Sequence, residues 1–288
     1  MVAGTSNNVK QFYNSSDLYF AICENRNEAD FKNVLDVIRQ YVPPNATLLE
    51  FGCGTGQLAS LVAQMGHKTL GVDISGRFIS YANEIYKDSP NLQFRLVDFS
   101  QLPFADHSFD CIYTSAVLEH CYEVDKIIAD FHRLLKPGGL LVIGTPNMLS
   151  PFTRLSLIGK WMAGKRQRFH LYGTPAFFLR SVWLNIKKAL VKKPALVYVI
   201  PKYTGFTESD EDVTYLSTHR DYLQLLKPFS YKILELARGA SKGGKIIAKF
   251  FPKLSGEVLI VALKRAWLAL FGYLADFLEV TLCFGLEI

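Results

Sequence analysis

Three glycines at alternate positions, placed directly after a short apolar strand, constrain the fold of this chain more than any other feature. The segment reads Leu48-Leu49-Glu50-Phe51-Gly52-Cys53-Gly54-Thr55-Gly56, and a helical pattern begins at Gln57. Glycines allow a sharp turn and a close approach of the backbone to a ligand, and the helix N-terminus behind them favours negative groups. A dinucleotide site would have Gly-x-Gly-x-x-Gly, whereas the third glycine here comes one residue early. The loop therefore predicts a ligand-binding strand–turn–helix unit, with a bare tight turn as the alternative.

Short β-rich runs alternate with helical periods from about residue 34 onward, which indicates repeated βα units and a parallel sheet. We expect helices over 31–41, 57–65, 75–87, 123–135 and 220–226. We expect strands over 46–51, 68–72, 93–97, 109–114, 140–144, 231–236 and 257–263. The alternation stops between 146 and about 215, where helices are expected over 155–162 and 176–190.

Two carboxylates follow the predicted second and third strands. Asp73 ends Gly71-Val72-Asp73-Ile74-Ser75, and Asp98-Phe99 ends the third strand. A carboxylate at the tip of the second strand can accept both ribose hydroxyls of an adenosine group. The second carboxylate can accept the adenine amino group while Phe99 flanks the ring. Each has an ordinary alternative, a helix cap for Asp73 and a turn for Asp98, but both fall where doubly wound sheets bind ligands.

Five segments in this order carry a family resemblance: LLEFGCGTG, GVDIS, VDFSQLPFADHSFD, IYTSAVLEH and LLKPGGLLVIGTPN. They resemble consecutive motifs of the class I S-adenosylmethionine-dependent methyltransferases, particularly the type 11 group, over roughly residues 46–147. The resemblance implies an enzyme with a Rossmann-like α/β fold and a seven-stranded, mostly parallel sheet whose last strand, 257–263, is antiparallel. It also implies a helical insertion after the fifth strand and S-adenosylmethionine as the cofactor.

The resemblance further implies which residues surround that cofactor. They are Glu50, Gly52, Cys53, Gly54, Thr55, Gly56, Asp73, Ile74, Asp98, Phe99 and Ser115. Tyr19 or Tyr13, in the N-terminal segment, can close over the methionine part.

Two histidines are candidates for a general base, with equal weight. Methyl transfer is an in-line displacement that alignment alone can accelerate, although an acceptor hydroxyl can also need deprotonation. His120 follows the fourth strand, and Glu119-His120 resembles part of a metal-binding segment in ubiquinone-pathway O-methyltransferases; we expect no metal. His219 lies in a segment similar to the His-x-Arg-x-Phe/Tyr of type 11 enzymes that act on quinones, sugars and lipid-linked saccharides. A histidine that only shapes the pocket is the alternative for His120.

The residues after the fourth strand also bear on the acceptor. Amino-methylating enzymes of nucleic acids have Asn/Asp-Pro-Pro-Tyr/Phe/Trp there, whereas this chain has Thr114-Ser115-Ala116-Val117. Amine acceptors are therefore disfavoured, and oxygen or carbon acceptors remain. The resemblance to type 11 enzymes implies O-methylation, or C-methylation, of a hydrophobic, quinone-like or lipid-linked saccharide acceptor. The competing hypotheses are an RNA methyltransferase and a non-catalytic, membrane-attached binding module on the same fold.

Positive charge is concentrated in one segment. Residues 131–207 contain thirteen Lys and Arg and no Asp or Glu, which leaves 19 basic against 26 acidic residues elsewhere. Within it, the predicted helix 176–190 carries Leu179, Val182, Trp183, Ile186 and Leu190 on one face, with lysines elsewhere. A basic amphipathic helix with an apolar-side tryptophan is typical of a membrane interface, so we expect residues 177–193 to contact an anionic membrane. A lid helix packed on the sheet is the alternative, and nucleic-acid binding is less favoured.

The C-terminal segment 265–288 is as long as a membrane span, but Asp276 and Glu279 near its middle argue against one. We expect a hydrophobic helix that lies in an interface or packs on the insertion or on a second subunit, as in a homodimer. The predicted organisation is a methyltransferase domain over 1–145 and 216–264, an insertion over 146–215 that forms an acceptor lid or membrane contact, and this tail. Scattered cysteines and an N-terminus without a secretory pattern predict a cytoplasmic protein. The basic helix and the hydrophobic tail add the expectation of peripheral membrane association.

Overall fold

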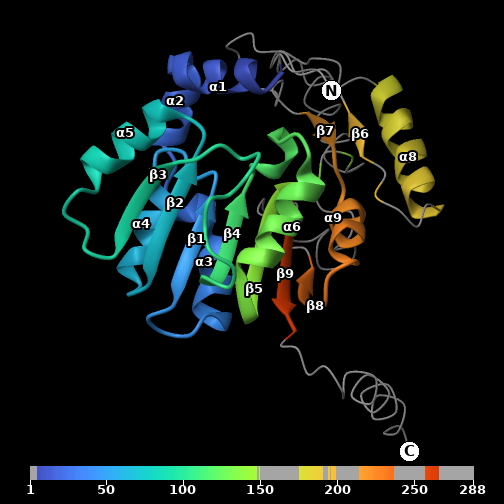
Figure 1. The fold of residues 1–288 in the computed structure, drawn as a ribbon. Coiled ribbons are helices and arrows are strands. Elements are labelled where there is room, and N and C mark those ends of the chain that lie inside the picture. The colour runs from blue at the N-terminus through green and yellow to red at the C-terminus, as the bar shows by residue number, and fades with distance from the viewer. Residues whose placement is uncertain are drawn as a thin grey trace, which may run out of the picture.

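A seven-stranded sheet forms the centre of the molecule. The computed structural model describes residues 5–147, 149, 175–190, 194, 196–198, 214–236 and 257–265. The strand order is β3-β2-β1-β4-β5-β9-β8 (Figure 1). These strands are β1 (Thr47–Phe51), β2 (Lys68–Asp73), β3 (Leu92–Leu96), β4 (Phe109–Ser115), β5 (Leu135–Pro146), β8 (Tyr231–Leu236) and β9 (Glu257–Lys264). Neighbours pair in parallel except β9, which is antiparallel to β5 and β8. The predicted fold class, including the position of the antiparallel strand, is confirmed.

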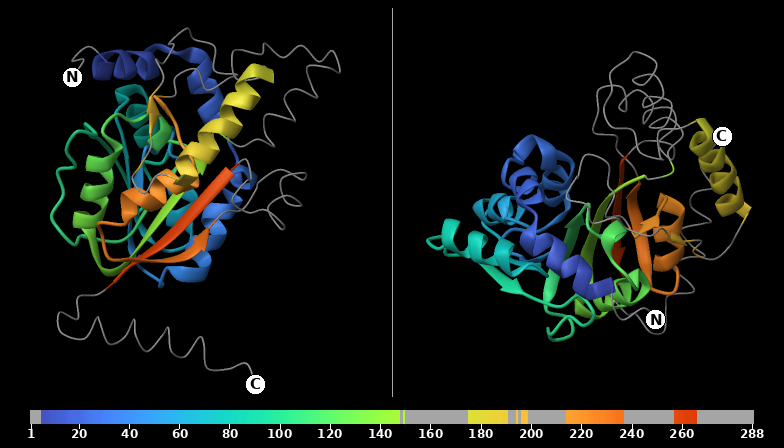
Figure 2. Two further views of the ribbon diagram at one scale, coloured as in Figure 1. Left: turned by 90° about the vertical axis from the view of Figure 1, so that its right-hand side faces the viewer. Right: turned by 90° about the horizontal axis from the view of Figure 1, so that it is seen from above.

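Helices cover both faces of the sheet (Figures 1 and 2). They are α1 (Thr5–Ser15), α2 (Asp17–Glu24), α3 (Glu28–Tyr41), α4 (Gln57–Gln64), α5 (Gly76–Ile85), the 3-10 helix η1 (Leu118–His120), α6 (Val124–Leu134), α8 (Pro175–Leu190) and α9 (His219–Leu226). Leu48 packs with α3 and α4 on one face, whereas Leu49 packs with α6 and α9 on the other. Successive strand residues are therefore both buried, which explains the continuous apolar runs of the central strands.

The helix starts follow local capping chemistry. Asn27 and Asp30 form a reciprocal capping box at the start of α3, and Thr218 and Asp221 form one at the start of α9. Each box satisfies backbone N–H groups that have no partner within the helix. These caps begin α3 three residues earlier than predicted and α9 one residue earlier.

The largest differences from the sequence prediction are two additional helices and an earlier start of one strand. The N-terminal helices α1 and α2 were not predicted, and they pack through aromatic side chains against Phe78 of α5. Strand β5 begins at Leu135 rather than Leu140, because Leu135 already pairs with Phe109 of β4. The pairing then shifts in register, so that Cys111 pairs with Leu140 and residues 136–139 form an irregularity in the strand.

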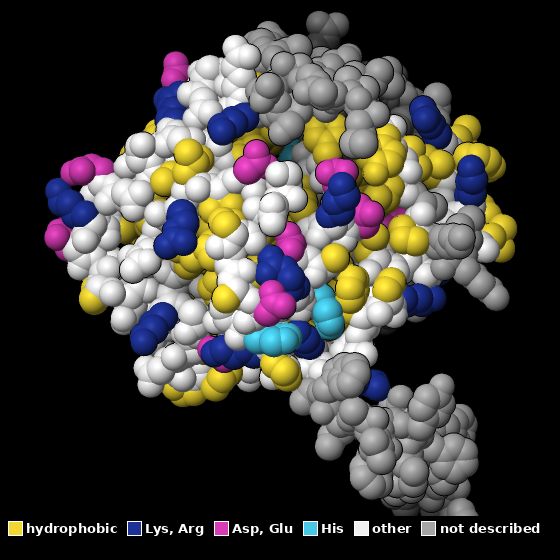
Figure 3. All heavy atoms as spheres, in the orientation of Figure 1, with side chains coloured by type: hydrophobic (Ala, Val, Ile, Leu, Met, Phe, Trp, Pro, Cys, Tyr) yellow, Lys and Arg dark blue, Asp and Glu magenta, His cyan; other side chains and the backbone are white. Residues whose placement is uncertain are grey.

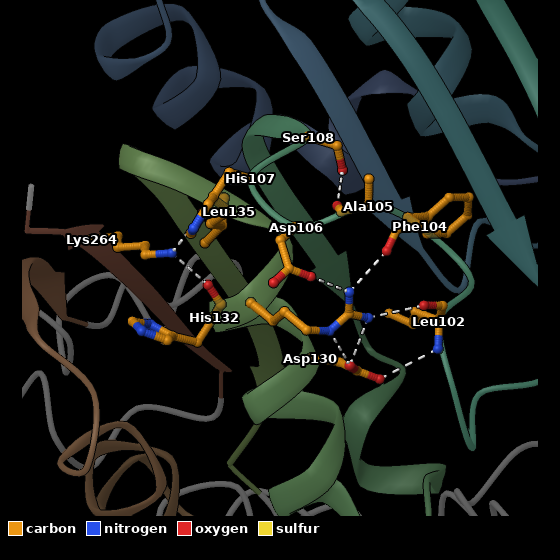
Figure 4. Close-up of polar contacts among 11 residues, drawn as sticks. Leu102, Phe104, Ala105, Asp106, His107, Ser108, Asp130, His132, Leu135 and Lys264 are labelled. Atoms are coloured by element: carbon orange, nitrogen blue, oxygen red, sulfur yellow. Dashed lines mark hydrogen bonds and ion pairs between the residues drawn. The ribbon is translucent and has the colours of Figure 1, made fainter.

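A cluster of polar contacts connects α6, the C-terminal end of β9 and the segment between β3 and β4 (Figure 4). Lys264 Nζ donates to the carbonyl oxygens of His132 (2.7 Å) and Leu135 (2.6 Å), which are acceptors at the C-terminal end of α6. Arg133 donates to the carbonyl oxygens of Leu102 (3.0 Å) and Phe104 (2.8 Å). The loop that begins with Asp98 and Phe99 is thereby held against α6.

The predicted insertion is described only in part. Helix α8 matches the helix predicted over 176–190, and β6 (Val197–Tyr198) pairs antiparallel with β7 (Tyr215–Leu216). The helix predicted over 155–162 and the tail 266–288 lie outside the described residues. Among the described helices, none is long and apolar enough to cross a membrane.

Candidate active site

One cavity, with a volume of about 250 Å³, lies at the carboxyl ends of β1, β2, β3 and β4. It is bounded by the glycine loop, by the residues after β2 and β3, by η1 and its flanks, and by α1 and α2. Most of the residues predicted to surround a cofactor line it. They are Tyr19, Glu50, Gly52, Cys53, Gly54, Thr55, Asp73, Ile74, Asp98, Phe99 and Ser115, together with Tyr13.

The glycine loop takes backbone conformations that other residues rarely adopt. Gly52 has φ +76°, and a Cβ atom there would lie 2.4 Å from a Val117 methyl group. Gly54 has φ +52° and open space where a Cβ atom would project, although it lines the cavity. Gly56, the third glycine, does not line the cavity, and a Cβ atom there would collide with Phe94. The loop is therefore shaped by packing at Gly52 and Gly56, and it leaves a cradle beside Gly54.

Asp73 joins the tip of β2 to the glycine loop. Its carboxylate accepts hydrogen bonds from the backbone N–H groups of Gly54 (2.9 Å) and Ser75 (2.9 Å). Burial raises the pKa of Asp73 to about 6, and these backbone N–H groups oppose that rise. A carboxylate that costs free energy to ionise, and that lines a cavity, is a feature of ligand-binding sites.

Glu50 is a second buried carboxyl group in the same cavity. Burial raises its pKa well above the usual value, and the nearby Asp73 raises it further, while Arg26 and the Tyr113 hydroxyl lower it. The Arg26 guanidinium lies 4.7 Å from the centre of the Phe31 ring. A cation and two carboxyl groups therefore share one wall of the cavity.

Asp98 and Phe99 form another part of the cavity wall. Hydrogen bonds from the backbone N–H and side chain of Ser100 lower the pKa of Asp98. The Phe99 ring packs on Phe51, with 4.0 Å between ring centres. This wall combines an ionised carboxylate with an apolar surface, as an amino-substituted aromatic ring requires.

The N-terminal helices cover the cavity through aromatic and polar contacts. The Tyr13 and Tyr19 rings lie 5.0 Å apart, and both residues line the cavity. Asn14 Oδ1 accepts a hydrogen bond from the backbone N–H of Arg77 (3.1 Å), and Gln57 donates to the Glu24 carbonyl oxygen (2.9 Å). Helices α1 and α2 are thus attached to α5 and α4 at the mouth of the cavity.

Of the three catalytic candidates, only His120 lines the cavity. Its Nε2 lies 3.8 Å from Glu119 Oε1, and the Glu119 side chain is 1% exposed. The other oxygen of that carboxylate accepts a hydrogen bond from the Thr145 hydroxyl (3.2 Å). Glu119 therefore lies behind His120, away from the cavity.

His219 is buried at the start of α9 and is not among the cavity-lining residues. Its helix contacts the insertion instead, because Asp221 forms a buried ion pair with Lys188 of α8. Among the described residues, no group of three His, Cys, Asp or Glu side chains is placed to hold a metal ion. The structure thus distinguishes the two histidines, which have equal weight as candidates in the sequence, because His120 lines the cavity and His219 does not.

Arg26 and Lys10 line the cavity but were not predicted. Arg26 lies in the turn between α2 and α3, and Lys10 lies in α1. Neither belongs to a local motif, so their position depends on how the N-terminal helices fold over the sheet. A lone basic residue in such a segment gives no sequence signal of its own.

The residues present fit S-adenosylmethionine. Asp73 would hold the ribose hydroxyls, Asp98 and Phe99 the adenine, and Glu50 with the tyrosines the methionine part. At Gly54 a Cβ atom would project into unfilled space, so the absence of a side chain would let the ligand approach the protein backbone closely.

Comparison with known proteins agrees with this geometry. Residues 49–143 match the sequence model of the methyltransferase domain family. The chain is 36% identical over 114 residues to a demethylmenaquinone methyltransferase of Tropheryma whipplei, covering 38% of this chain and 47% of that protein. It is 36% identical over 101 residues to a ubiquinone biosynthesis O-methyltransferase of Agrobacterium fabrum, covering 35% and 40%. The chain therefore spans less than half the length of these curated relatives.

Solved structures share the fold at low sequence identity. An S-adenosylmethionine-dependent methyltransferase from Mesorhizobium loti has a TM-score of 0.53 at 16% identity, covering 82% of this chain and all of that one. The [4+2]-cyclase SpnF has a TM-score of 0.58 at 17% identity, covering 93% and 98%. The second protein is named for a different reaction, so the fold alone does not fix the chemistry.

The sheet order, the cavity and the sequence match together define the class. This chain contains an S-adenosylmethionine-dependent methyltransferase domain of the Rossmann-like α/β fold, with residues 49–143 as its matched part.

Proposed function

We propose that this protein transfers a methyl group from S-adenosylmethionine to an oxygen atom of a hydrophobic acceptor, of the quinone-like or lipid-linked saccharide type. Transfer to carbon is the variant of this proposal. The observation that carries it is the position of His120, which lines the same cavity as Gly54 and Asp73 and has the buried Glu119 carboxylate behind it.

The cofactor, when bound, supplies the electrophilic methyl group. Asp73, Asp98 and Glu50 would bind and orient it, while Tyr13 and Tyr19 exclude water from the cavity mouth. Alignment of donor and acceptor in such a cavity removes much of the entropic barrier to an in-line displacement.

His120 is proposed as the general base for an acceptor hydroxyl. The imidazole would take the hydroxyl proton while the acceptor oxygen gains the methyl group. The sulfur–methyl bond would break in the same step, leaving S-adenosylhomocysteine. The Glu119 carboxylate, 3.8 Å away, stabilises the imidazolium that results. The hydrogen bond from Thr145 fixes that carboxylate in place.

The rest of the cavity lining is better suited to an apolar organic acceptor than to a metal or metalloid ion. The cavity lining also includes Val117, Tyr122 and Ile127, which are close to His120 in sequence. Burial raises the pKa of the Cys53 and Cys121 thiols, which disfavours the thiolate forms that bind metals and metalloids. Quinone precursors match this lining, and the named activities of the two curated relatives agree with that choice.

The test is a methylation assay with methyl-labelled S-adenosylmethionine on three acceptor preparations: quinone-type phenols, a lipid extract and total RNA. We expect label in the phenol or lipid arm, with product mass increased by one methyl group. His120→Asn should lower kcat by at least about a hundredfold. His219→Asn is the matched control, because its histidine lies outside the cavity, and it should keep kcat near the wild-type value.

Other outcomes assign a different function. Activity that appears only with RNA and disappears after RNase treatment would support the RNA methyltransferase. Tight cofactor binding without turnover in all three arms would support the non-catalytic binding module. A full kcat in His120→Asn would contradict the proposed base.

A further inference from the structure

Helix α8 exposes large apolar side chains and buries polar ones, which is the reverse of the usual arrangement for a helix packed on a protein core. Four large apolar residues are exposed: Leu179 (67%), Trp183 (58%), Ile186 (56%) and Leu190 (79%). Their spacing of four, three and four residues places them in one stripe along the helix. We call these four residues the α8 stripe. A stripe of this size is costly to leave in water, so it indicates a partner outside the described core.

The buried face of α8 is largely polar. Ser181, Leu184 and Lys188, on the opposite side from the α8 stripe, are 0–5% exposed. Lys188 pairs with Asp221 of α9 and donates to the Leu216 carbonyl oxygen (3.0 Å). Asn185 donates to the Leu149 carbonyl oxygen (2.7 Å). These polar contacts fix which face of the helix points outward, so the exposure of the stripe is a consequence of how the helix is anchored.

Basic side chains flank the α8 stripe. Arg180 and Lys187 are exposed and lie on the same side of it, seven residues apart. Lys187 Nζ lies 5.3 Å from the centre of the Trp183 ring. Figure 3 shows hydrophobic side chains, with Lys and Arg among them, at the edge of the molecule where Figure 1 places α8. The segment 131–207, to which α8 belongs, contains thirteen Lys and Arg and no Asp or Glu.

The positive charge beside the α8 stripe favours an anionic lipid surface over a second copy of this chain as its partner. A second copy would bring its own Arg180 and Lys187 toward these residues, whereas anionic lipid head groups carry the complementary charge. Tryptophan is suited to the boundary between head groups and acyl chains, because its ring is apolar and its N–H is polar. Lysine and arginine stems lie along an apolar surface while their charges stay in water.

We propose that α8 is a membrane-docking helix, which lays the α8 stripe into the interface of an anionic lipid bilayer while Arg180 and Lys187 contact the head groups. This goes beyond the proposed function and does not depend on the identity of the acceptor. Helix α8 lies toward the same end of the molecule as α1, which covers the cavity (Figures 1 and 2).

The test is binding of the full chain to vesicles of phosphatidylcholine alone or with phosphatidylglycerol, measured by co-sedimentation. We expect binding to the anionic vesicles and at least tenfold weaker binding to the neutral ones. Trp183→Gln/Ile186→Gln should lose roughly tenfold or more in affinity for anionic vesicles. Arg180→Gln/Lys187→Gln should reduce the preference for anionic over neutral vesicles.

A matched control separates the stripe from general surface hydrophobicity. Ile85 (54% exposed) and Ile233 (39% exposed) lie on α5 and β8, away from α8. Ile85→Gln/Ile233→Gln removes two exposed isoleucines and should bind vesicles as the wild type does. Calorimetric binding of S-adenosylmethionine should be unchanged in all three variants, which shows that they are folded and separates this test from that of the proposed function.

Tryptophan fluorescence reports directly on the stripe. In a Trp161→Phe/Trp267→Phe background, Trp183 is the one remaining tryptophan. We expect acrylamide to quench its emission in vesicle-free protein, and anionic vesicles to shift the emission to the blue and make it sensitive to brominated lipid.

Four results would overturn the proposal. The first is no binding to either vesicle, and the second is binding that Trp183→Gln/Ile186→Gln leaves unchanged. The third is a dimer in sedimentation velocity that the same variant dissociates, which would make the stripe an interface between copies. The fourth is emission of Trp183 shielded from acrylamide in monomeric, vesicle-free protein, which would mean that another segment of the chain covers it.

Discussion

The β1–α4 unit and helix α8 distribute apolar and polar side chains in opposite ways. In β1, Leu48, Leu49 and Phe51 are fully buried, and the polar groups gather in the cavity at the end of the strand. In α8, the buried face contains Ser181 and Lys188, and the large apolar residues face outward. The first arrangement is complete within one chain, whereas the second needs a partner. The contrast distinguishes the part of the molecule that we propose binds a small ligand from the part that we propose binds a membrane surface.

The largest expected effect concerns the ion pair that anchors α8. Lys188→Met leaves Asp221 buried without its cation, and removing one partner of a buried pair typically costs about 3–5 kcal/mol. We expect a loss of this size in the free energy of unfolding by urea, with faster hydrogen exchange in α8. Lys187→Met is the control, because Lys187 is exposed, and its cost should be below about 0.5 kcal/mol. Equal stabilities for the two variants would contradict the anchoring role of Lys188.

The next effect distinguishes the cradle at Gly54 from backbone strain. Gly54 and Gly66 both have positive φ angles, +52° and +90°, and open space where a Cβ atom would project, but only Gly54 lines the cavity. Gly54→Ala and Gly66→Ala should each lose about 1–2 kcal/mol of unfolding free energy. Only Gly54→Ala should weaken S-adenosylmethionine binding, by about a hundredfold or roughly 2.7 kcal/mol. A similar loss of affinity in both variants would assign the effect to strain.

The raised pKa of Asp73 predicts how cofactor affinity depends on pH. Because burial places this pKa at about 6, the carboxyl group is protonated in the free protein at lower pH and cannot accept two ribose hydroxyls. Affinity should fall by up to about tenfold per pH unit below 6. The Asp73→Asn variant should lack this component, so the difference between the two titrations isolates Asp73. Parallel pH profiles would show that Asp73 does not titrate on binding.

The raised pKa of Asp73 affects the free energy of unfolding in the opposite direction: lower pH weakens cofactor binding but stabilises the fold. A carboxyl group whose pKa is higher in the folded than in the unfolded protein destabilises the fold when ionised. From pH 6 down to about 4 that cost disappears, and it amounts to about 3 kcal/mol for a shift of this size. The Asp73 contribution to unfolding free energy, obtained by subtracting the Asp73→Asn profile, should therefore rise as the pH falls. A contribution that falls over this range would contradict the burial argument.

The smallest expected effect concerns the attachment of the N-terminal helices. Arg77 pairs with the exposed Asp17 (2.8 Å) and lies 4.4 Å from the centre of the Phe20 ring. Such exposed contacts contribute about 1 kcal/mol or less, so Arg77→Met should weaken cofactor binding by roughly two- to fivefold. Lys87→Met breaks a similar surface pair with Glu84 (2.9 Å), away from the cavity, and should leave affinity unchanged.

Local sequence signals predicted the sheet and the cavity walls well. Apolar runs, the glycine loop and carboxylates after β2 and β3 are all features of a few consecutive residues, and their positions follow from strand–turn–helix geometry. Contacts between distant segments were not predictable in this way. Arg26 reaches the cavity only because α2 and α3 fold over the sheet, and α1 and α2 are stabilised by rings that meet Phe78.

The choice between the two histidines also depends on distant segments. His120 lies on η1 directly after β4, whereas His219 belongs to the chain that returns from the insertion. The hydrogen bond from the Thr214 N–H to the Glu119 carbonyl oxygen (2.9 Å) brings these segments side by side. His219 then starts a helix whose Asp221 pairs with α8, so its helix connects the core to the insertion. A motif alone cannot show which of two neighbouring segments reaches the cavity.

The measurement that tests the central claim most directly is a calorimetric titration of S-adenosylmethionine into the wild-type protein and Asp73→Ala. We expect a micromolar dissociation constant, on the order of −8 kcal/mol, and a loss of about a hundredfold in the variant. Asp88→Ala, an exposed aspartate outside the cavity, should bind as the wild type does. Absence of binding to the wild type, or equal binding to wild type and Asp73→Ala, would contradict the assignment of this cavity to the cofactor.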